Sequence, residues 1–383
     1  MKYSTLKPLL FKLNPETAHN LAIWALANNL VFAPKITEYP SLQTKVFGLD
    51  FCNPIGMAAG FDKNAQIFAN LFNFGFGFVE VGTVTPKPQI GNEKPRIFRL
   101  EEDLAIINRL GFNNLGIDNF LENISKNSAP NKILGKILGI NIGKNKDTQN
   151  AIDDYLLLLR KTYGHSSYIT INISSPNTTN LRDLQKADEL DLFLQAIFTE
   201  KKILQNATNK NIPILLKIAP DINQAEQEAI ANIALKNNID GLIIGNTTIS
   251  RPENLQSKYK IETGGLSGKP LFLISNEVLK NIYQLTKGKI PIIAAGGVAS
   301  GSDAYQKIKL GASLVQIYSA FIYQGFELTQ KIKKELDDCL KKDGFKNINQ
   351  AMPPKYTKQV EDTDLMTKDL LGKITTENAG CVK

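Results

Sequence analysis

The sequence predicts an α/β fold, a (β/α)8 TIM barrel with an N-terminal amphipathic helical extension. Three observations predict it: eight short apolar runs follow one another along the chain, helical stretches separate most of them, and no G-x-G-x-x-G motif follows the first run. Eight alternating units favour a closed barrel over an open doubly wound sheet. The missing glycine motif argues against a dinucleotide-binding sheet.

The eight runs are short, apolar and typical of buried strands. They cover residues 53–59, 78–84, 136–142, 168–173, 212–218, 241–245, 291–295 and 313–318. The helical stretches between them include residues 151–162, 188–205, 224–237 and 302–310. This alternation is that of a parallel sheet whose strands are connected by helices.

The composition is that of a folded globular protein. The 383 residues are 43% hydrophobic and 21% charged, which disfavours a disordered chain, a collagen-like chain and a polytopic membrane protein. The net charge of +8 could suit nucleic acid or anionic lipid, but the lysines are scattered between Asp and Glu and form no long basic block. We therefore expect no nucleic-acid partner.

The few cysteines and histidines limit which metal sites, disulfides and catalytic triads the chain could form. Cys52, Cys339 and Cys381 are far apart and have neither zinc-site nor disulfide spacing, so they indicate incidental thiols in a reducing compartment. Only His19 and His165 are available for a Ser-His-Asp triad or a histidine metal cage. We expect no metal.

Residues 1–40 form a distinct N-terminal segment. Leucines recur at helical spacing over residues 6–13, and an Asn-Pro-Glu sequence at 14–16 opens a second helix. The second helix is too short and too interrupted to span a bilayer, and no small-residue cleavage site suggests a signal peptide. Two alternatives stay open: the pair caps the main domain, which periodicity alone favours, or it lies in a membrane surface with Trp24 and lysines among the headgroups.

The rest of the chain divides into the barrel, residues 41–338, and a C-terminal extension, residues 339–383. Two connections, residues 85–135 and 247–289, are longer than a barrel requires, and each is expected to pass over the active face. The extension mixes charged residues with Pro and Asn and shows little apolar periodicity. We interpret it as peripheral or partly disordered, without an assigned role.

The stretch 169–181, ITINISSPNTTNL, is where the chemistry is expected. A β-branched strand ends at a Ser-Ser-Pro-Asn break, which presents Asn172, Ser175 and Asn177 at the carboxyl end of the strand. The alternative is an ordinary strand followed by an Asn/Pro turn.

Polar residues end most of the predicted strands, and in a barrel these ends converge on one face. They are Lys63, Thr83, Asn141, Asn172, Ser175, Lys217, Asn246 and Thr247. A pocket with two cations, several amides and hydroxyls but no carboxylate pair is unsuited to glycosidase chemistry. Amides suit a ligand with many carbonyl and N–H groups, because each amide both donates and accepts.

Glycines gather where the last two strands end. Gly296 and Gly297 follow the seventh strand, and Tyr318 and Ser319 follow the eighth, where barrels of this kind commonly bind phosphate. A phosphorylated ligand is expected. The segment GGLSGKP resembles a phosphate loop, but Pro270 stands where a Walker motif requires Ser or Thr, so we reject a nucleoside triphosphatase.

Lys217 lies inside the apolar run ILLKIAP. It could be a Schiff-base lysine, a fixed cation facing a ring that gains negative charge, or a structural lysine paired with a carboxylate. A lysine within an apolar strand is seldom incidental, which favours a functional role.

Nine motifs, in order, resemble one known family. They are NPIGMAAGFDKN, GFGFVEVGTVTPKPQIGNEKPRIFRL, INRLGFNNLG, LGINIGKNK, INISSPNT, LKIAPD, GNTT, TGGLSGKP and GASLVQIYSAFI. Together they resemble the quinone-linked, membrane-associated class of dihydroorotate dehydrogenases over most of residues 5–325. The resemblance implies an FMN-containing barrel that oxidises (S)-dihydroorotate to orotate in de novo pyrimidine (UMP) biosynthesis, with a quinone as the final electron acceptor.

The resemblance also implies which residues bind the two ligands. For FMN they are Ala59, Gly60, Phe61, Asp62, Lys63, Thr83, Asn141, Asn172, Lys217, Gly245, Gly268, Gly297, Tyr318 and Ser319. For the substrate they are Lys63, Asn108, Arg109, Leu110, Gly111, Phe112, Asn172, Asn177, Asn246 and Thr247. Gly245 departs from the family, which has a small hydroxylated residue there, so its contact with the flavin would come from the backbone only.

By the same resemblance, Ser175 is the catalytic base that removes the C5 proton while hydride leaves C6 for the flavin, and Lys217 stabilises the reduced, anionic flavin. Serine is a poor base at neutral pH. We hypothesise that a water relay drains its proton and that Lys63 lowers the barrier electrostatically. Soluble members of the family use cysteine as this base and lack the N-terminal helices, so Ser175 favours the quinone class.

In the quinone class the N-terminal helix pair forms a tunnel mouth at the membrane surface, and His19 and Arg99 match tunnel-lining positions. The resemblance therefore favours a membrane-surface helix pair for residues 1–40 over the cap that periodicity alone favours. It implies a peripheral membrane protein, on the cytoplasmic side of the cell membrane if the chain is bacterial.

Two other interpretations compete. A tRNA dihydrouridine synthase would need a basic RNA-binding domain after the barrel, and the mixed-charge C-terminal extension is not one. A catalytically silent binding module is hard to reconcile with an intact set of Lys63, Ser175 and Lys217.

Overall fold

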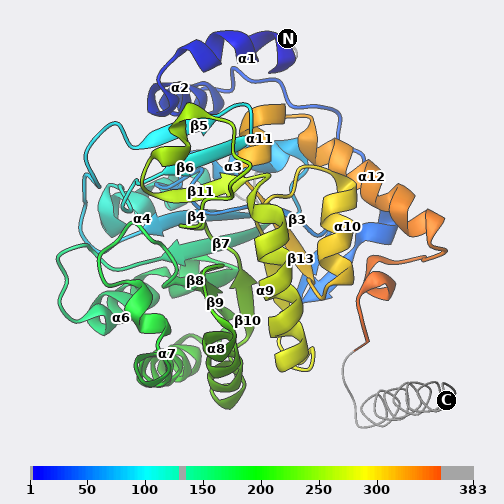
Figure 1. Ribbon diagram of the computed structural model, residues 1–383. Helices are drawn as coiled ribbons and strands as arrows, with labels where there is room; N and C mark the ends of the chain where they lie inside the picture. The colour runs from blue at the N-terminus through cyan, green and yellow to red at the C-terminus, as the bar shows by residue number, and fades with distance from the viewer. Residues whose placement is uncertain (1–2, 129–134, 355–383) are drawn as a thin grey trace, which may run out of the picture.

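The computed structural model describes residues 3–128 and 135–354, and eight parallel strands among them close into a barrel (Figure 1). These strands are β3 (Ile55–Met57), β4 (Phe78–Val84), β7 (Ile137–Ile142), β8 (Tyr168–Asn172), β9 (Ile214–Ile218), β10 (Gly241–Ile244), β12 (Ile292–Ala295) and β13 (Leu314–Ile317). Around the barrel they run β10-β12-β13-β3-β4-β7-β8-β9, and β9 pairs with β10. The predicted fold class is confirmed, and each predicted apolar run contains one barrel strand.

Helices cover the outside of the barrel, as the alternating pattern predicts (Figure 1). They are α3 (Phe68–Leu71), α4 (Gly116–Asn127), α6 (Ala151–Thr162), α7 (Ala187–Thr208), α8 (Gln224–Lys236), α9 (Leu271–Leu285), α10 (Gly301–Lys309), α11 (Ser319–Gln324) and α12 (Leu328–Lys342). The 3₁₀ turns are η1 (Pro40–Leu42), η2 (Phe72–Phe74), η3 (Tyr163–His165), η4 (Arg182–Gln185), η5 (Lys258–Ile261) and η6 (Ile348–Ala351). The main apolar core lies between the strands and these helices.

A hairpin closes the end of the barrel at which the strands begin. β1 (Thr44–Val46) pairs antiparallel with β2 (Leu49–Phe51). Phe51 packs in one apolar cluster with Phe78 and Tyr168, the first residues of β4 and β8. The hairpin strands have three residues each, too few to show an alternating pattern, and we did not predict them. Because aromatic side chains fill this end, the end at which the strands finish is the one open to ligands.

A smaller sheet lies at that open end, between the barrel and the N-terminal helices (Figure 1). β5 (Ile97–Leu100), β6 (Ala105–Asn108) and β11 (Gly265–Gly268) pair antiparallel in the order β11-β6-β5. β5 and β6 belong to the long connection 85–135, and β11 belongs to the connection 247–289. The two predicted excursions therefore meet in one sheet above the barrel.

Helices α1 (Tyr3–Lys12) and α2 (Pro15–Ala27) lie over the small sheet and α11 (Figure 1). Arg99 of β5 donates hydrogen bonds to the carbonyl oxygens of Leu10 and Leu13, which join the end of α1 to the sheet. No helix within the described ranges combines the length and the apolar character that crossing a bilayer requires.

The C-terminal boundary that we predicted between residues 338 and 339 falls inside α12. The helix continues because Leu336 and Leu340, one turn apart, are both buried against the barrel. Residues 339–354 therefore belong to the outer layer of the barrel. The remainder of the predicted extension, residues 355–383, lies outside the described residues.

An ion pair between Glu16 and Arg96 anchors α2. Arg96 is only 4% exposed; it donates to both carboxylate oxygens of Glu16 (2.6 and 3.1 Å) and to the carbonyl oxygens of Ile90 and Asn92. Burial raises the pKa of Glu16, but the hydrogen bonds and charges of Arg96 and Lys94 outweigh burial, so the pKa lies below its ordinary value. The pair therefore stabilises the docked helix above the ordinary pKa and weakens as the pH falls through the lowered one.

We expect Glu16→Gln to loosen α2. The substitution leaves the buried Arg96 charge without its carboxylate, which should lower the opening free energy of residues 15–27 by about 2 kcal/mol, measured by amide hydrogen exchange. Glu122→Gln is the matched control, because Glu122 pairs with Lys126 on an exposed helix face. Glu122→Gln should lower the opening free energy of α4 by less than about 0.5 kcal/mol. If the two substitutions lowered the opening free energies of their helices equally, the Glu16–Arg96 pair would not be what anchors α2.

Candidate active site

One cavity of about 1170 Å³ joins the N-terminal helices to the carboxyl ends of the barrel strands. Most of the residues that we predicted from the sequence line it. They are His19, Ala59, Gly60, Phe61, Lys63, Thr83, Arg99, Asn108, Leu110, Gly111, Phe112, Asn172, Ser175, Asn177, Lys217, Gly245, Asn246, Thr247, Gly268, Gly297, Tyr318 and Ser319. The barrel thus brings together side chains that lie far apart in the sequence.

Three predicted residues do not line the cavity. The Asp62 carboxylate accepts hydrogen bonds from the backbone N–H groups of Gln66 (2.8 Å) and Ile67 (2.7 Å), and burial raises its pKa to about 6. Arg109 forms an ion pair with Glu262 at 2.8 Å. The third, Asn141, is fully buried behind the wall. Each of the three is held by hydrogen bonds or an ion pair that the sequence did not predict.

Three glycines of the cavity wall have backbone conformations that exclude a side chain. The φ angles of Gly245, Gly268 and Gly297 are +110°, +97° and +75°. A Cβ on Gly245 or Gly268 would lie 2.4 or 2.3 Å from a backbone carbonyl oxygen, and one on Gly297 would lie 2.5 Å from Phe272 Cβ. A ligand can approach these backbones closely.

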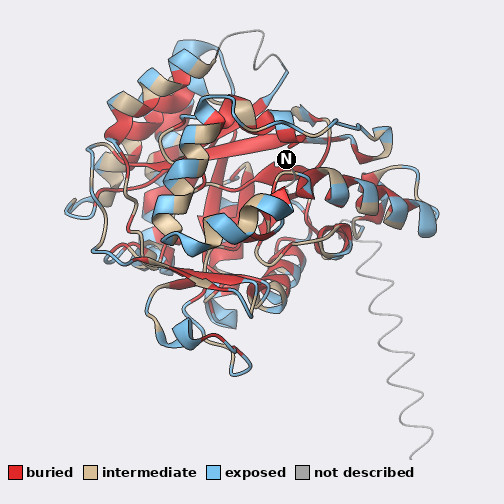
Figure 2. Ribbon diagram, turned by 90° about the horizontal axis from the view of Figure 1, so that it is seen from above, coloured by how far each residue is buried: buried red, intermediate tan, exposed pale blue. Residues whose placement is uncertain are grey.

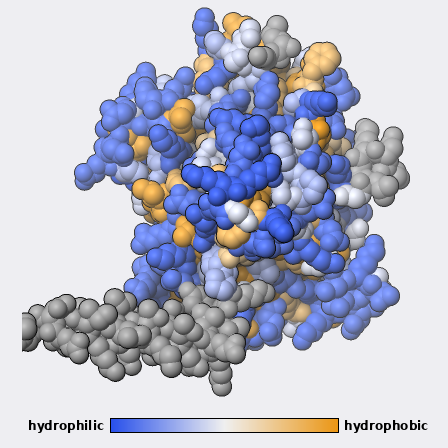
Figure 3. All heavy atoms as spheres, turned by 90° about the vertical axis from the view of Figure 1, so that its right-hand side faces the viewer, coloured by the Kyte–Doolittle hydropathy of each residue, from blue (hydrophilic) through white to orange (hydrophobic). Residues whose placement is uncertain are grey.

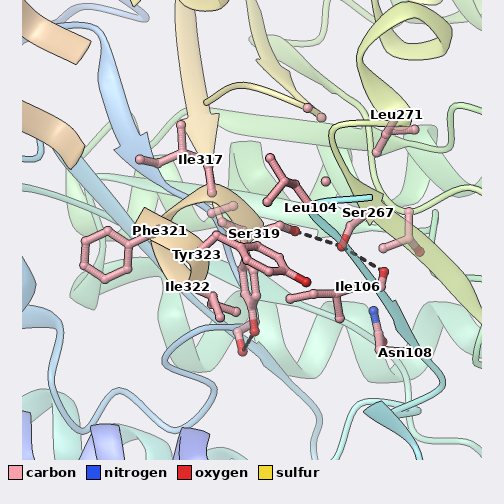
Figure 4. Close-up of a pocket in the computed structure, with 18 of the residues that line it drawn as sticks. Leu104, Ile106, Asn108, Ser267, Leu271, Ile317, Ser319, Phe321, Ile322 and Tyr323 are labelled. Atoms are coloured by element: carbon pink, nitrogen blue, oxygen red, sulfur yellow. Dashed lines mark hydrogen bonds between the residues drawn. The ribbon is translucent and has the colours of Figure 1, made fainter. Parts of the chain in front are cut away.

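Two hydroxyl groups lie close together next to Gly268, on Ser267 and Ser319. Ser267 Oγ lies 2.9 Å from Ser319 Oγ and donates to the carbonyl oxygen of Ile106 at 3.2 Å (Figure 4). The first residues of α9, from Leu271 onward, line the same part of the cavity. Small residues, hydroxyls and a helix N-terminus together suit an anion such as a phosphate. We call the wall at Gly268, Gly296 and Gly297 the glycine cradle.

A chain of hydrogen-bonded side chains crosses the floor of the cavity. Thr83 Oγ1 donates to Asn141 Oδ1 (2.6 Å), and Asn172 Nδ2 donates to both Thr83 Oγ1 (3.1 Å) and Asn141 Oδ1 (3.0 Å). Ser174 Oγ donates to Asn172 Oδ1 (3.0 Å) and accepts from Asn246 Nδ2 (2.9 Å). These residues come from four different strands or strand ends, so the barrel sets the direction of each amide.

Glu80 is a buried residue of this site that we did not predict. Its carboxylate accepts hydrogen bonds from Asn141 Nδ2 (2.8 Å), Gln316 Nε2 (2.8 Å), Tyr168 OH (3.0 Å) and Thr170 Oγ1 (3.2 Å). Within the described ranges no group of three His, Cys, Asp or Glu side chains could hold a metal ion. The charged residue in the apolar run FVEVGTV was the signal in the sequence, the same kind of signal that singled out a lysine in ILLKIAP.

Lys217 and Lys63 are cations of the cavity wall, and Lys217 is buried whereas Lys63 is half-buried. Burial lowers the pKa of Lys217, and the charge of Glu80 opposes that shift. Burial, and next the charge of Arg96, lower the pKa of Lys63 to about 8, whereas Glu16 raises it. Among the described residues neither lysine forms an ion pair within 4.0 Å, so both charges are available to an anionic ligand.

Ser175 stands at the turn after β8, 7% exposed, where its Oγ accepts from the N–H of Asn177 at 3.3 Å. Asn177 Nδ2 in turn donates to the carbonyl oxygen of Asn108 at 3.1 Å, which connects this turn to the small sheet. Thr247 Oγ1 is buried and has no hydrogen-bond partner in the described part of the chain. An unpaired hydroxyl in the wall is available to a polar ligand.

Arg182 is a second residue that we did not predict. Its guanidinium donates to the carbonyl oxygens of Ser174 (3.0 Å) and Thr247 (3.1 Å) and pairs with Asp221 at 2.9 Å. It therefore clamps together the two loops that carry Ser175 and Thr247. Nothing in the pattern around residue 182 indicated this, because its partners lie in other βα units.

A comparison with known proteins relates the chain to one family. A family model described as dihydroorotate dehydrogenase matches residues 41–340. "Dihydroorotate dehydrogenase (quinone)" of Azorhizobium caulinodans is 47% identical over 350 residues, 91% of this chain and 98% of that protein. The mitochondrial protein of the same name from Arabidopsis thaliana is 46% identical and covers 90% of this chain and 80% of its own length. The crystal structure of DHODH in complex with ferulenol from Eimeria tenella superposes with a TM-score of 0.85 at 43% identity, covering 88% and 94% of the two chains.

We expect His19 to stay uncharged at neutral and mildly acidic pH. Burial, and next the charge of Lys63, lower its pKa from 6.5 to about 3. Between these values the unfolded chain binds a proton that the folded chain does not, so stability falls as the pH is lowered from 6.5. Nitrogen NMR of labelled histidine should show no protonation of His19 between about pH 8 and pH 5, and a midpoint near 6.5 would contradict the assignment.

Proposed function

The chain belongs to the dihydroorotate dehydrogenase family, and we propose that it oxidises dihydroorotate to orotate and delivers the electrons through a flavin to a quinone. This reaction is a step of pyrimidine biosynthesis. The observation that carries the proposal is one continuous cavity. In it, a pocket of amides, lysines and Ser175 adjoins the glycine cradle and opens towards α1 and α2.

FMN is the flavin that these residues fit. The glycine cradle leaves room for a phosphate close to the backbone, and Lys217 places a buried cation where a flavin ring could gain negative charge. When bound, FMN would accept a hydride from the substrate and pass the electrons on to the quinone. The residues proposed to hold it are Ala59, Gly60, Phe61, Lys63, Thr83, Asn172, Lys217, Gly245, Gly268, Gly297, Tyr318 and Ser319. We place Asp62 and Asn141 behind the wall, where they orient residues that touch the flavin.

The substrate is a cyclic imide with a carboxylate, and the pocket offers groups for both parts. Lys63 is a half-buried cation of the cavity wall without an ion pair among the described residues, which suits the carboxylate. The unpaired Thr247 hydroxyl and the amides can pair with the ring carbonyl and N–H groups. The residues proposed to hold the substrate are Lys63, Asn108, Leu110, Gly111, Phe112, Asn172, Asn177, Asn246 and Thr247. Arg109 supports this set through its ion pair with Glu262.

Ser175 is the base that takes the proton from C5 of the substrate. Its hydroxyl lies at the cavity wall, and the N–H of Asn177 fixes its direction. Serine is a poor base at neutral pH and needs help to accept the proton. A water relay that drains the serine proton, together with the Lys63 charge, lowers the barrier. A serine in this place is the feature that favours a quinone as the final acceptor.

The quinone enters through the N-terminal helices, past His19 and Arg99, which both line the cavity. Apolar side chains of α1 and α2 are exposed: Leu9 is 64% and Trp24 57% exposed. Figure 2 shows exposed surface on these helices, which lie over the buried strands, and Figure 3 shows apolar surface at the same end of the molecule. We place this end in the surface of a membrane as a peripheral contact, on the cytoplasmic side if the chain is bacterial.

Ser175→Ala should slow reduction of the flavin by dihydroorotate about 100-fold or more, because a general base contributes rates of that order. Stopped-flow absorbance of the flavin measures this rate. Orotate affinity should stay nearly unchanged, which separates loss of the base from loss of the pocket. A reduction rate equal to that of the unsubstituted enzyme would remove Ser175 from the mechanism.

Leu9→Glu together with Trp24→Glu should weaken binding to vesicles of anionic and neutral phospholipid, because the apolar surface of α1 and α2 would carry charge. Vesicle co-sedimentation measures binding, and the oxidation rate with a long-tailed quinone in the vesicles should fall about tenfold or more. Leu192→Glu is the matched control, since Leu192 is also 64% exposed but lies on α7. Equal losses in the double variant and the control would refute the membrane contact.

A further inference from the structure

We propose that Lys307 is a positioning residue for the phosphate end of the cofactor and that it supplies, from behind the glycine cradle, the positive charge that holds a phosphate there. The inference rests on the proposed function, because the phosphate in question is that of FMN. Lys307 does not line the cavity, and none of the sequence motifs that identify the family includes it.

The first observation is a buried ammonium group with neutral partners only. Lys307 lies on α10 and is 0% exposed. Its Nζ donates to Ser275 Oγ (2.9 Å) and Asn276 Oδ1 (2.8 Å) and lies 5.2 Å from the centre of the Phe272 ring. In the described part of the chain no carboxylate lies within ion-pair distance of it. A buried charge without a countercharge destabilises a fold unless an anion compensates it.

Asn276 accepts a hydrogen bond from Lys307 through its Oδ1, and this orientation leaves its own buried amide N–H group, on Nδ2, without a partner among the described residues. An unsatisfied buried N–H group costs free energy, and that cost is compensated where the oxygen meets a charged donor. The arrangement is therefore built around a protonated lysine.

The second observation links this lysine to the glycine cradle. Ser275 Oγ, which accepts from Lys307, donates to the carbonyl oxygens of Phe272 (3.0 Å) and Gly296 (3.2 Å). Phe272, Gly296 and Gly297 all line the cavity, and a Cβ on Gly297 would collide with Phe272. Two consecutive hydrogen bonds thus connect Lys307 Nζ to the backbone of the cradle, so its charge lies directly behind the wall.

Two other charged residues lie near the glycine cradle, and neither can supply the positive charge that we assign to Lys307. Lys269 lines the cavity but is exposed, so water screens its charge. The carboxylate of Asp303 also lies in the wall, where it accepts from the N–H of Ala299 at 2.9 Å. Burial lowers the pKa of Lys307 to about 7, and Asp303 opposes that shift. An anion in the cradle would favour the protonated lysine in the same way.

The test compares FMN with riboflavin, which has the same ring system without the phosphate, in the full-length chain. Lys307→Met keeps an unbranched apolar side chain, one atom shorter than that of lysine, and removes the charge. We expect the Kd of FMN, measured by flavin fluorescence after exchange of the bound flavin, to rise about tenfold, because a charge behind a buried wall acts at low dielectric. The Kd of riboflavin should change less than about twofold. A lysine that served packing alone would weaken both flavins equally.

Lys333→Met is the matched control. Lys333 is also 0% exposed, but it lies on α12, does not line the cavity and pairs with Glu38 at 3.1 Å. Its loss should leave the ratio of the two Kd values unchanged. If Lys307→Met does not fold, Lys307→Gln gives the same test, because glutamine still donates hydrogen bonds without a charge.

The outcomes separate this inference from the proposed function. A wild-type chain that binds FMN and riboflavin equally would refute the phosphate site and with it FMN as the cofactor. A wild-type chain that prefers FMN, with Lys307 variants that keep the same preference, would refute the role of Lys307 and leave the cofactor assignment intact.

Discussion

Closure of the parallel sheet is the constraint on which the rest of the structure depends. Because β13 pairs with β3, all eight strands finish on one face. Phe51, Phe78 and Tyr168 fill the opposite end, so only the carboxyl face can receive a ligand. Side chains from separate βα units therefore share one cavity, and the small sheet with α1 and α2 extends that cavity away from the barrel.

Buried positive charge is the second common feature of the site. Lys217 and Lys307 are buried and Lys63 is half-buried, and none of them forms an ion pair with another described residue. Withdrawing such charges from water costs free energy that packing alone does not recover. On the proposals above, each lysine meets an anionic part of a ligand: the substrate carboxylate, the flavin ring or the phosphate. The empty barrel is thus less stable than the loaded one, which couples folding to ligand binding.

The N-terminal helices extend the polar site of the barrel with apolar walls, because Leu10, Phe11 and Ala22 line the same cavity. Glu16 and Arg96 hold α2 against the loop before β5, and Arg99 holds the end of α1. His19, which lines the cavity beside these helices, stays neutral because burial lowers its pKa to about 3. The same two helices expose apolar side chains on the outside. On the proposals above, one short segment serves both the quinone path and the membrane surface.

By itself the sequence determined the eight strands, the polar residues at their ends and the family, because apolar runs, breaks and motifs consist of consecutive residues. Only the tertiary structure decided that Asp62 and Asn141 do not line the cavity, and that Glu80 and Lys307 lie fully buried outside its lining. The hairpin of β1 and β2 could not be predicted either, because strands of three residues are too short to show an alternating pattern. The physical reason for Asn141, Glu80 and Lys307 is that a buried polar side chain is placed by partners that are distant in the chain, and those partners cannot be identified from its neighbours in sequence.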